Sequence, residues 1–96
     1  MEETHNFKVV VQELSDIYER KNHDYGNSFS RSFVDFGPIA AVVRMSDKME
    51  RLKTLCRKEA LVNESLRDTA MDLANYAIML VMELDKRKIY DIIDKV

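Results

Sequence analysis

The sequence predicts an all-α fold, an antiparallel bundle of three long helices with a short C-terminal helix. Apolar residues recur at spacings of three and four along most of the chain, as in amphipathic helices. The 96 residues include only two Gly and one Pro, whereas sheet proteins with many turns use more of both. The connections between the later periodic segments are short, which favours antiparallel neighbours. A chain of this length should form a single domain over residues 1–96.

The first half of the chain predicts one helix and one long loop. The first helix should fade near Asn22 and has apolar positions at helical spacing: Phe7, Val10, Val11, Leu14, Ile17 and Tyr18. Residues 22–37 lose this period and are rich in turn-forming and aromatic residues, which predicts a loop of a length that is often functional. Gly37 ends this segment, and Pro38 suits the first turn of a second helix over residues 39–58.

The second half predicts a long third helix over residues 64–86 and a short fourth helix over 89–96. Beyond Leu73 the third helix is apolar almost all round, and such a helix is buried by partners on every side. A chain of this size offers few such partners and forms a thin core. We therefore expect a homodimer or homotetramer to complete the bundle.

Composition excludes several classes of protein. The net charge is −2 and no basic run is present, which argues against a duplex-DNA partner. A single cysteine, Cys56, excludes an internal disulfide and a cysteine-rich zinc site. The N-terminus does not resemble a signal peptide, and the longest near-apolar run, 77–82, is far shorter than the roughly 20 residues that span a bilayer. We expect a soluble, cytoplasmic protein without a membrane partner.

An acidic stripe marks the third predicted helix. Its four members, Glu64, Asp68, Asp72 and Asn75, fall within a sector of about 80°. Neighbouring carboxylates at this spacing repel one another, and burying an unpaired carboxylate is costly, so a cation or a metal ion should accompany them. Oxygen ligands without Cys or His favour Mg²⁺ or Mn²⁺. The alternative is the solvated polar edge of an ordinary amphipathic helix.

The second predicted helix can supply a facing wall. Asp47 and Glu50 point in about the same direction, and Lys48 and Arg51 are their neighbours. One interpretation gives the acids to a metal ion and the cations to phosphate, which Arg binds well. The other is a solvated, salt-bridged helix surface, the common reason for alternating charge.

Three ordered strings of residues stand out along the chain. They are Lys21-x-x-Asp24-Tyr25-Gly26, then Arg44-x-x-Asp47-Lys48-x-x-Arg51-Leu52, then Glu64-Ser65-x-x-Asp68-Thr69-x-x-Asp72-Leu73-x-Asn75-Tyr76-Ala77. Together they resemble a known family, the phage and bacterial nucleotide-modification-associated domain, which is similar to the MazG-like all-α nucleoside triphosphate pyrophosphohydrolases. The resemblance covers about residues 21–80.

The resemblance implies a Mg²⁺-dependent enzyme that cleaves or at least binds a (deoxy)nucleoside triphosphate. It implies a metal site of Asp47, Glu50, Asp68 and Asp72, with Asp68 substituting for a family Glu at the position of Thr69. Glu50 or Glu64 would be the catalytic base. The substrate-binding residues would be Lys21, Asp24, Tyr25, Lys48, Arg51 and Asn75, with Tyr25 and either Phe29 or Phe33 stacking on the base. The competing hypothesis is a non-catalytic, oligomeric phage accessory or protein-interaction module.

Overall fold

The computed structural model describes residues 1–25, 27–57 and 63–94, with the side chains of residues 1–23, 27–57 and 66–88. Four helices make up the described chain: α1 (Glu2–Tyr25), α2 (Ser28–Phe36), α3 (Ile39–Arg57) and α4 (Asn63–Asp94). No strand occurs in these ranges. The predicted all-α class is confirmed.

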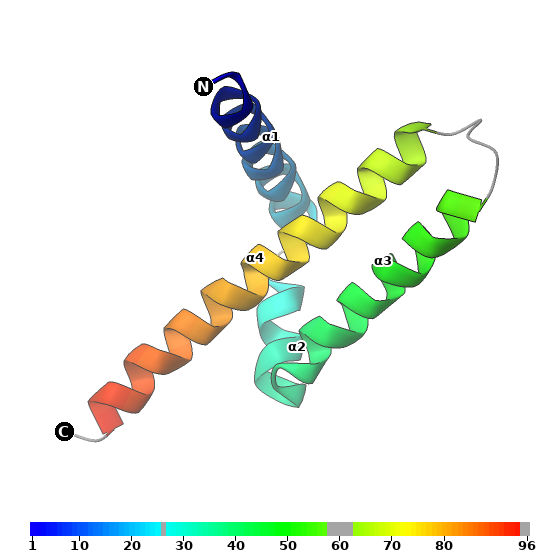
Figure 1. Cartoon of the computed structure of the whole chain (residues 1–96). Coiled ribbons are helices and arrows are strands. Elements are labelled where there is room, and N and C mark those ends of the chain that lie inside the picture. Colours follow the sequence, from blue (N-terminus) through cyan, green and yellow to red (C-terminus); the bar gives the residue numbers. More distant parts are fainter. Residues whose placement is uncertain (26, 58–62, 95–96) are drawn as a thin grey trace.

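The helices α3 and α4 form an antiparallel pair, and α1 crosses α4 near its middle (Figure 1). The short helix α2 lies between the end of α1 and the start of α3. The N-terminal half of α1 extends away from the other helices (Figure 1). The arrangement brings the C-terminal end of α1, the start of α2 and the middle of α4 together.

A small apolar core holds this junction. Its buried apolar side chains come from all four helices: Leu14, Phe29, Phe33, Ala41 and Met71. Phe33, with 1% of its surface exposed, is the most buried large side chain. Phe29 and Phe33 lie one turn apart on α2 and therefore project from the same face of the helix.

Residues 22–37 are not the long loop that the sequence predicts. They include the last turn of α1 and the nine-residue helix α2. The helical pattern in this segment is short, because only Phe29 and Phe33 are buried and the intervening positions are polar. Helices this short are marginal in isolation, so the packing of the two phenylalanines against the rest of the fold stabilises α2.

Gly37 ends α2, at the boundary that Gly37 and Pro38 predict. Its φ of 80° is the only positive φ among the described residues, and glycine adopts this conformation without the steric cost of a Cβ atom. The Gly37 N–H donates to the Phe33 carbonyl at 2.7 Å, a common way to close a helix. Helix α3 then begins at Ile39, directly after Pro38.

The C-terminal segment is not a separate helix, because α4 continues through the predicted break to Asp94. Residues 87 and 88 are Arg and Lys, and neither residue type interrupts a helix as Gly or Pro would. The apolar half of α4 is also not buried on every side within one chain. Ile78, Val81 and Met82 are 44%, 55% and 39% exposed. In the described part of the chain, no helix is both long enough and apolar enough to cross a membrane.

Candidate functional site

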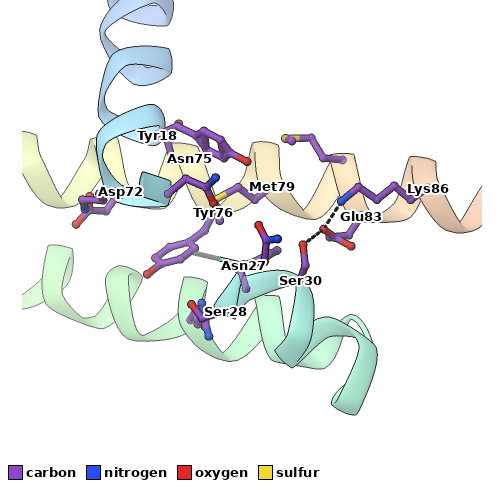
Figure 2. Close-up of a pocket in the computed structure, with 15 residues that line it drawn as sticks. Tyr18, Asn27, Ser28, Ser30, Asp72, Asn75, Tyr76, Met79, Glu83 and Lys86 are labelled. Atoms are coloured by element: carbon purple, nitrogen blue, oxygen red, sulfur yellow. Dashed lines mark hydrogen bonds and ion pairs between the residues drawn. The ribbon is translucent and has the colours of Figure 1, made fainter. Parts of the chain in front are cut away.

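A cavity of about 430 Å³ lies where α1, α2 and α4 meet. Its volume falls within the range of roughly 300–1,000 Å³ that is usual for small-molecule sites. Figure 2 shows the α4 residues along one wall, with Asp72 and Glu83 toward opposite ends. The lining side chains are Tyr18, Lys21, Asn22, Asn27, Ser28, Phe29, Ser30, Arg44, Asp72, Asn75, Tyr76, Met79, Met82, Glu83 and Lys86.

At one end of the cavity, cations from two helices converge on the carboxylate of Asp72. Lys21 Nζ on α1 lies 2.7 Å from Asp72 Oδ1, and Lys48 Nζ on α3 lies 3.4 Å from Oδ2. The side chains of Asp72 and Lys48 are 22% and 27% exposed, whereas Lys21 is 55% exposed. Two cations on one anion leave a net positive charge beside the cavity.

At the other end, the carboxylate of Glu83 is 10% exposed and held by two donors. Ser30 Oγ donates to Glu83 Oε1 at 2.5 Å, and Lys86 Nζ donates to the same oxygen at 2.9 Å (Figure 2). Burial raises the pKa of Glu83, but these hydrogen bonds and the charges of Lys86 and Arg87 outweigh burial, and the pKa lies below its ordinary value. Glu83 is therefore a fixed anion at neutral pH.

Aromatic rings occupy the space between the two ends. The rings of Phe29 and Tyr76 stack with centroids 6.1 Å apart. The guanidinium of Arg44 lies 5.3 Å from the Phe29 centroid, and its Nη2 donates to Ser32 Oγ at 3.1 Å. A guanidinium over a ring face is held by a cation–π interaction. Arg44 is thus fixed beside the cavity.

Asn75 connects the cavity wall to α1. Its amide Nδ2 donates to the Leu14 carbonyl at 3.1 Å, and the residue is 9% exposed. The ion pair between Arg67 and Glu13, at 2.5 Å, adds a second link between α4 and α1. The hydrogen bond from Arg67 lowers the pKa of Glu13. These contacts fix the crossing of α1 and α4 and thereby the position of Lys21.

The structure brings three of the predicted site residues together: Lys21, Lys48 and Asp72 share one ion-pair network. Asn75 lines the cavity with Lys21 and Asp72, whereas Lys48 is not among the lining residues. The acidic stripe therefore does have cation partners at Asp72, as its unfavourable charge pattern indicated.

The other predicted residues lie elsewhere or outside the described side chains. Asp47, Arg51 and Asp68 are exposed and do not line the cavity. Glu50 is exposed on α3 and pairs with Lys53 at 3.1 Å. The side chains of Asp24, Tyr25 and Glu64 lie outside the described residues. Within the described part of the chain, no three His, Cys, Asp or Glu side chains lie close enough together to hold a metal ion.

Of the two phenylalanines predicted to stack on a base, Phe29 lines the cavity and Phe33 does not. Phe33 lies in the core with the Arg87 guanidinium 4.8 Å from its ring centroid.

Sequence reasoning missed the Glu83 end of the site. Residue 83 follows residue 72 by eleven positions, which is close to three helical turns and places both on one face of α4. An acid within the otherwise apolar half of that helix was the available signal. Its partner Ser30, 53 residues away, carried no signal because it lies in the segment that was predicted to be a loop.

A comparison with protein families decides which family the chain belongs to. The model of the family described as nucleotide modification associated domain 1 matches residues 21–84. This chain belongs to that family. No curated protein and no solved structure matches the chain. The matched region of the nucleotide modification associated domain spans the cavity from Lys21 to Glu83, and only Tyr18 and Lys86 among the lining residues fall outside it.

Proposed function

We propose that this chain binds a (deoxy)nucleoside triphosphate in the cavity and, with Mg²⁺, acts as a pyrophosphohydrolase-like protein in nucleotide metabolism or modification. The observation that carries the proposal is the convergence of Lys21 and Lys48 on Asp72 at one end of a cavity lined by aromatic rings. Membership of a nucleotide modification associated family supports nucleotide as the ligand class.

The phosphates would occupy the Asp72 end. Lys21 and Lys48 carry two positive charges there against the single charge of Asp72, and Arg44, whose guanidinium lies over the Phe29 ring, adds a third positive charge to the cavity lining. Lysine ammonium groups bind phosphate as point charges, and the planar guanidinium binds phosphate oxygens in pairs. Because Asp72 already holds both lysines in place, less side-chain freedom is lost when they bind a ligand.

The sugar and base would occupy the rest of the cavity. Tyr76, Phe29, Met79 and Met82 line it, and ligand pockets usually combine such apolar walls with a few polar groups that set orientation. Asn75 is already committed to Leu14 through its Nδ2 atom. Its carbonyl oxygen is the part of the side chain that would contact a ligand.

A metal ion fits this donor set only together with its nucleotide. Of the four predicted metal ligands, Asp72 alone lines the cavity. Mg²⁺ commonly takes one or two protein carboxylates and completes its shell with water and substrate phosphates, so Asp72 would hold it. When bound, Mg²⁺ would neutralise phosphate charge and polarise a phosphoryl oxygen. Lys21 and Lys48, which contact Asp72, would bind the phosphates.

Isothermal titration calorimetry with a non-hydrolysable deoxynucleoside triphosphate tests binding. Lys21→Ala and Lys48→Ala should each weaken binding by about tenfold or more, because a hydrogen bond to a charged group contributes about 1.5–3 kcal/mol. Lys8→Ala, on the part of α1 that does not line the cavity, is the matched control and should bind as wild type does. Failure of the wild type to bind any nucleotide, with or without Mg²⁺, would refute the proposal.

The variant Asp72→Asn separates a metal-binding role from a lysine-positioning role. If Asp72 holds Mg²⁺, the variant should still bind triphosphate without the ion, but its affinity for the triphosphate should not rise when Mg²⁺ is added. If Mg²⁺ raises the affinity of wild type and variant equally, Asp72 is not a metal ligand. A hydrolysis screen over common and modified deoxynucleotides with Mg²⁺ or Mn²⁺ then tests for pyrophosphate release, and no turnover would exclude the enzymatic part.

A second observation favours self-association. Phe7, Val10 and Val11 on α1 are 70%, 39% and 42% exposed, and Ile78 and Val81 on α4 are also exposed. Apolar residues at helical spacing on an uncovered helix indicate an interface. We therefore propose a homodimer or homotetramer. The competing function, a non-catalytic interaction module, would use the same exposed apolar residues of α1 and α4. Light scattering after size-exclusion chromatography measures the mass in solution and so tests self-association, which a monomer at every concentration would refute.

A further inference from the structure

We propose, building on the nucleotide-binding function above, that the Glu83 end of the cavity recognises the base. Glu83 would select bases with an exocyclic amino group, namely cytosine, adenine or guanine, over uracil and thymine. The substrate class is thereby narrowed to amino-bearing nucleotides.

The charges at the two ends orient the ligand. Lys21 and Lys48 outnumber Asp72 at the first end, whereas Lys86 and Glu83 cancel at the second. Arg87 also acts on Glu83 through its charge, but its guanidinium lies over Phe33. Polyanionic phosphates are attracted to the first end, which carries a net positive charge, more strongly than to the second end, where the charges of Glu83 and Lys86 cancel. The uncharged base therefore belongs beside Glu83.

The hydrogen bonds of Glu83 leave an acceptor for the base. Ser30 and Lys86 both donate to Oε1, and neither donates to Oε2. The carboxylate is held by contacts to α2 and to its own helix, so Oε2 has a defined position. Since Ser30 uses its hydroxyl hydrogen on Glu83, the Ser30 oxygen also presents only acceptor capacity to the cavity. Glu83 Oε2 and the Ser30 oxygen can thus accept hydrogen bonds from a ligand, beside the ammonium group of Lys86, which is bonded to Oε1.

An amino group matches these acceptors and a carbonyl does not. Cytosine presents an N4 amino donor where uracil and thymine present the O4 acceptor, and a glutamate accepts from the cytosine amino group in known base contacts. A carbonyl placed against a carboxylate leaves both without a donor, which is costly in a buried site. Adenine and guanine also carry amino donors, so the same preference should include them.

A purely structural role is the alternative, since Ser30 and Glu83 join α2 to α4. That role requires no discrimination between bases. Binding of the non-hydrolysable triphosphates of deoxycytidine and deoxyuridine, which differ at the base edge, separates the two roles. Wild type should bind the cytosine analogue at least about tenfold more tightly. The triphosphate of N4,N4-dimethyldeoxycytidine, whose amino hydrogens are replaced, should lose this advantage.

The variant Glu83→Gln should bring the ratio of the two affinities close to one, because an amide can face either base with a donor or an acceptor. Glu13→Gln makes the same chemical change at a residue that joins two helices but does not line the cavity, and it should keep the wild-type ratio. Equal binding of the cytosine and uracil analogues by wild type, or an unchanged ratio in a folded Glu83→Gln, would overturn base recognition while nucleotide binding stands. If Glu83→Gln does not fold, the wild-type measurements with the three analogues decide. No binding of any analogue would overturn both proposals.

Discussion

The contact between Asn75 and Leu14 gives a sharp test of how α1 is held against the cavity. Asn75→Asp preserves the size and shape of the side chain but replaces the Nδ2 donor by a carboxylate oxygen that faces the Leu14 carbonyl. The residue is only 9% exposed, so solvent compensates little. The variant loses a hydrogen bond of about 1 kcal/mol and leaves a buried charged group unsatisfied, at a further 1–3 kcal/mol or so.

The expected loss of stability is therefore at least about 2 kcal/mol at neutral pH. For a domain of this size each kcal/mol lowers the melting temperature by roughly 4–8 °C, so Tm should fall by at least about 8 °C. Thermal unfolding followed by far-UV circular dichroism measures it. The same substitution at Asn6, an exposed residue near the start of α1, is the control and should change stability by less than about 0.5 kcal/mol.

The pH dependence of this variant has a definite sign. Burial and the facing carbonyl raise the folded-state pKa of the new carboxyl above its unfolded value. The folded variant then binds a proton more readily than the unfolded chain, so its deficit relative to wild type should shrink as the pH falls through that raised pKa. A Tm of Asn75→Asp that matches the Asn6→Asp control, or a deficit that does not change with pH, would show that Asn75 does not hold α1 through this bond.

Three further predictions concern the core, the buried acid and the exposed apolar surface. Phe33→Ala should lower the free energy of unfolding by about 3–5 kcal/mol because the ring is almost fully buried. Denaturant unfolding should show no comparable loss for Phe36→Ala, whose ring is 71% exposed; similar losses in the two variants would show that Phe33 is not a core residue. Because the folded pKa of Glu83 is lowered from 4.5, its stabilisation should be present above that pH and lost as the pH falls through the lowered pKa. Glu83→Gln should flatten this acid dependence, and an unchanged slope in acid unfolding would refute it. Phe7→Glu should shift the association measured by sedimentation toward monomer, and unaltered association would place the interface elsewhere.

Local chemistry determined much of the fold. The all-α class, the boundary at Gly37 and Pro38, and the start of α3 at Ile39 agree with the structure. These features depend on helical spacing, on the φ that glycine tolerates and on the ring of proline, which all act within a few residues. The segment around α2 differs from the predicted loop because its helix has only nine residues, so that the four-residue spacing of Phe29 and Phe33 is too short a pattern to identify without the packing that buries both rings.

The sequence by itself also identified Lys21, Lys48, Asp72 and Asn75 as candidates. Only the tertiary structure decided that Lys21, Lys48 and Asp72 form one ion-pair network and that Asn75 lines the same cavity as Lys21 and Asp72. The Lys21–Asp72 pair joins positions 51 residues apart, and the Ser30–Glu83 pair joins positions 53 apart. Pattern along a helix indicates which residues share a face but not which face of another helix lies opposite. That choice depends on the crossing of α1 over α4, which Asn75, Leu14 and the small buried core fix together.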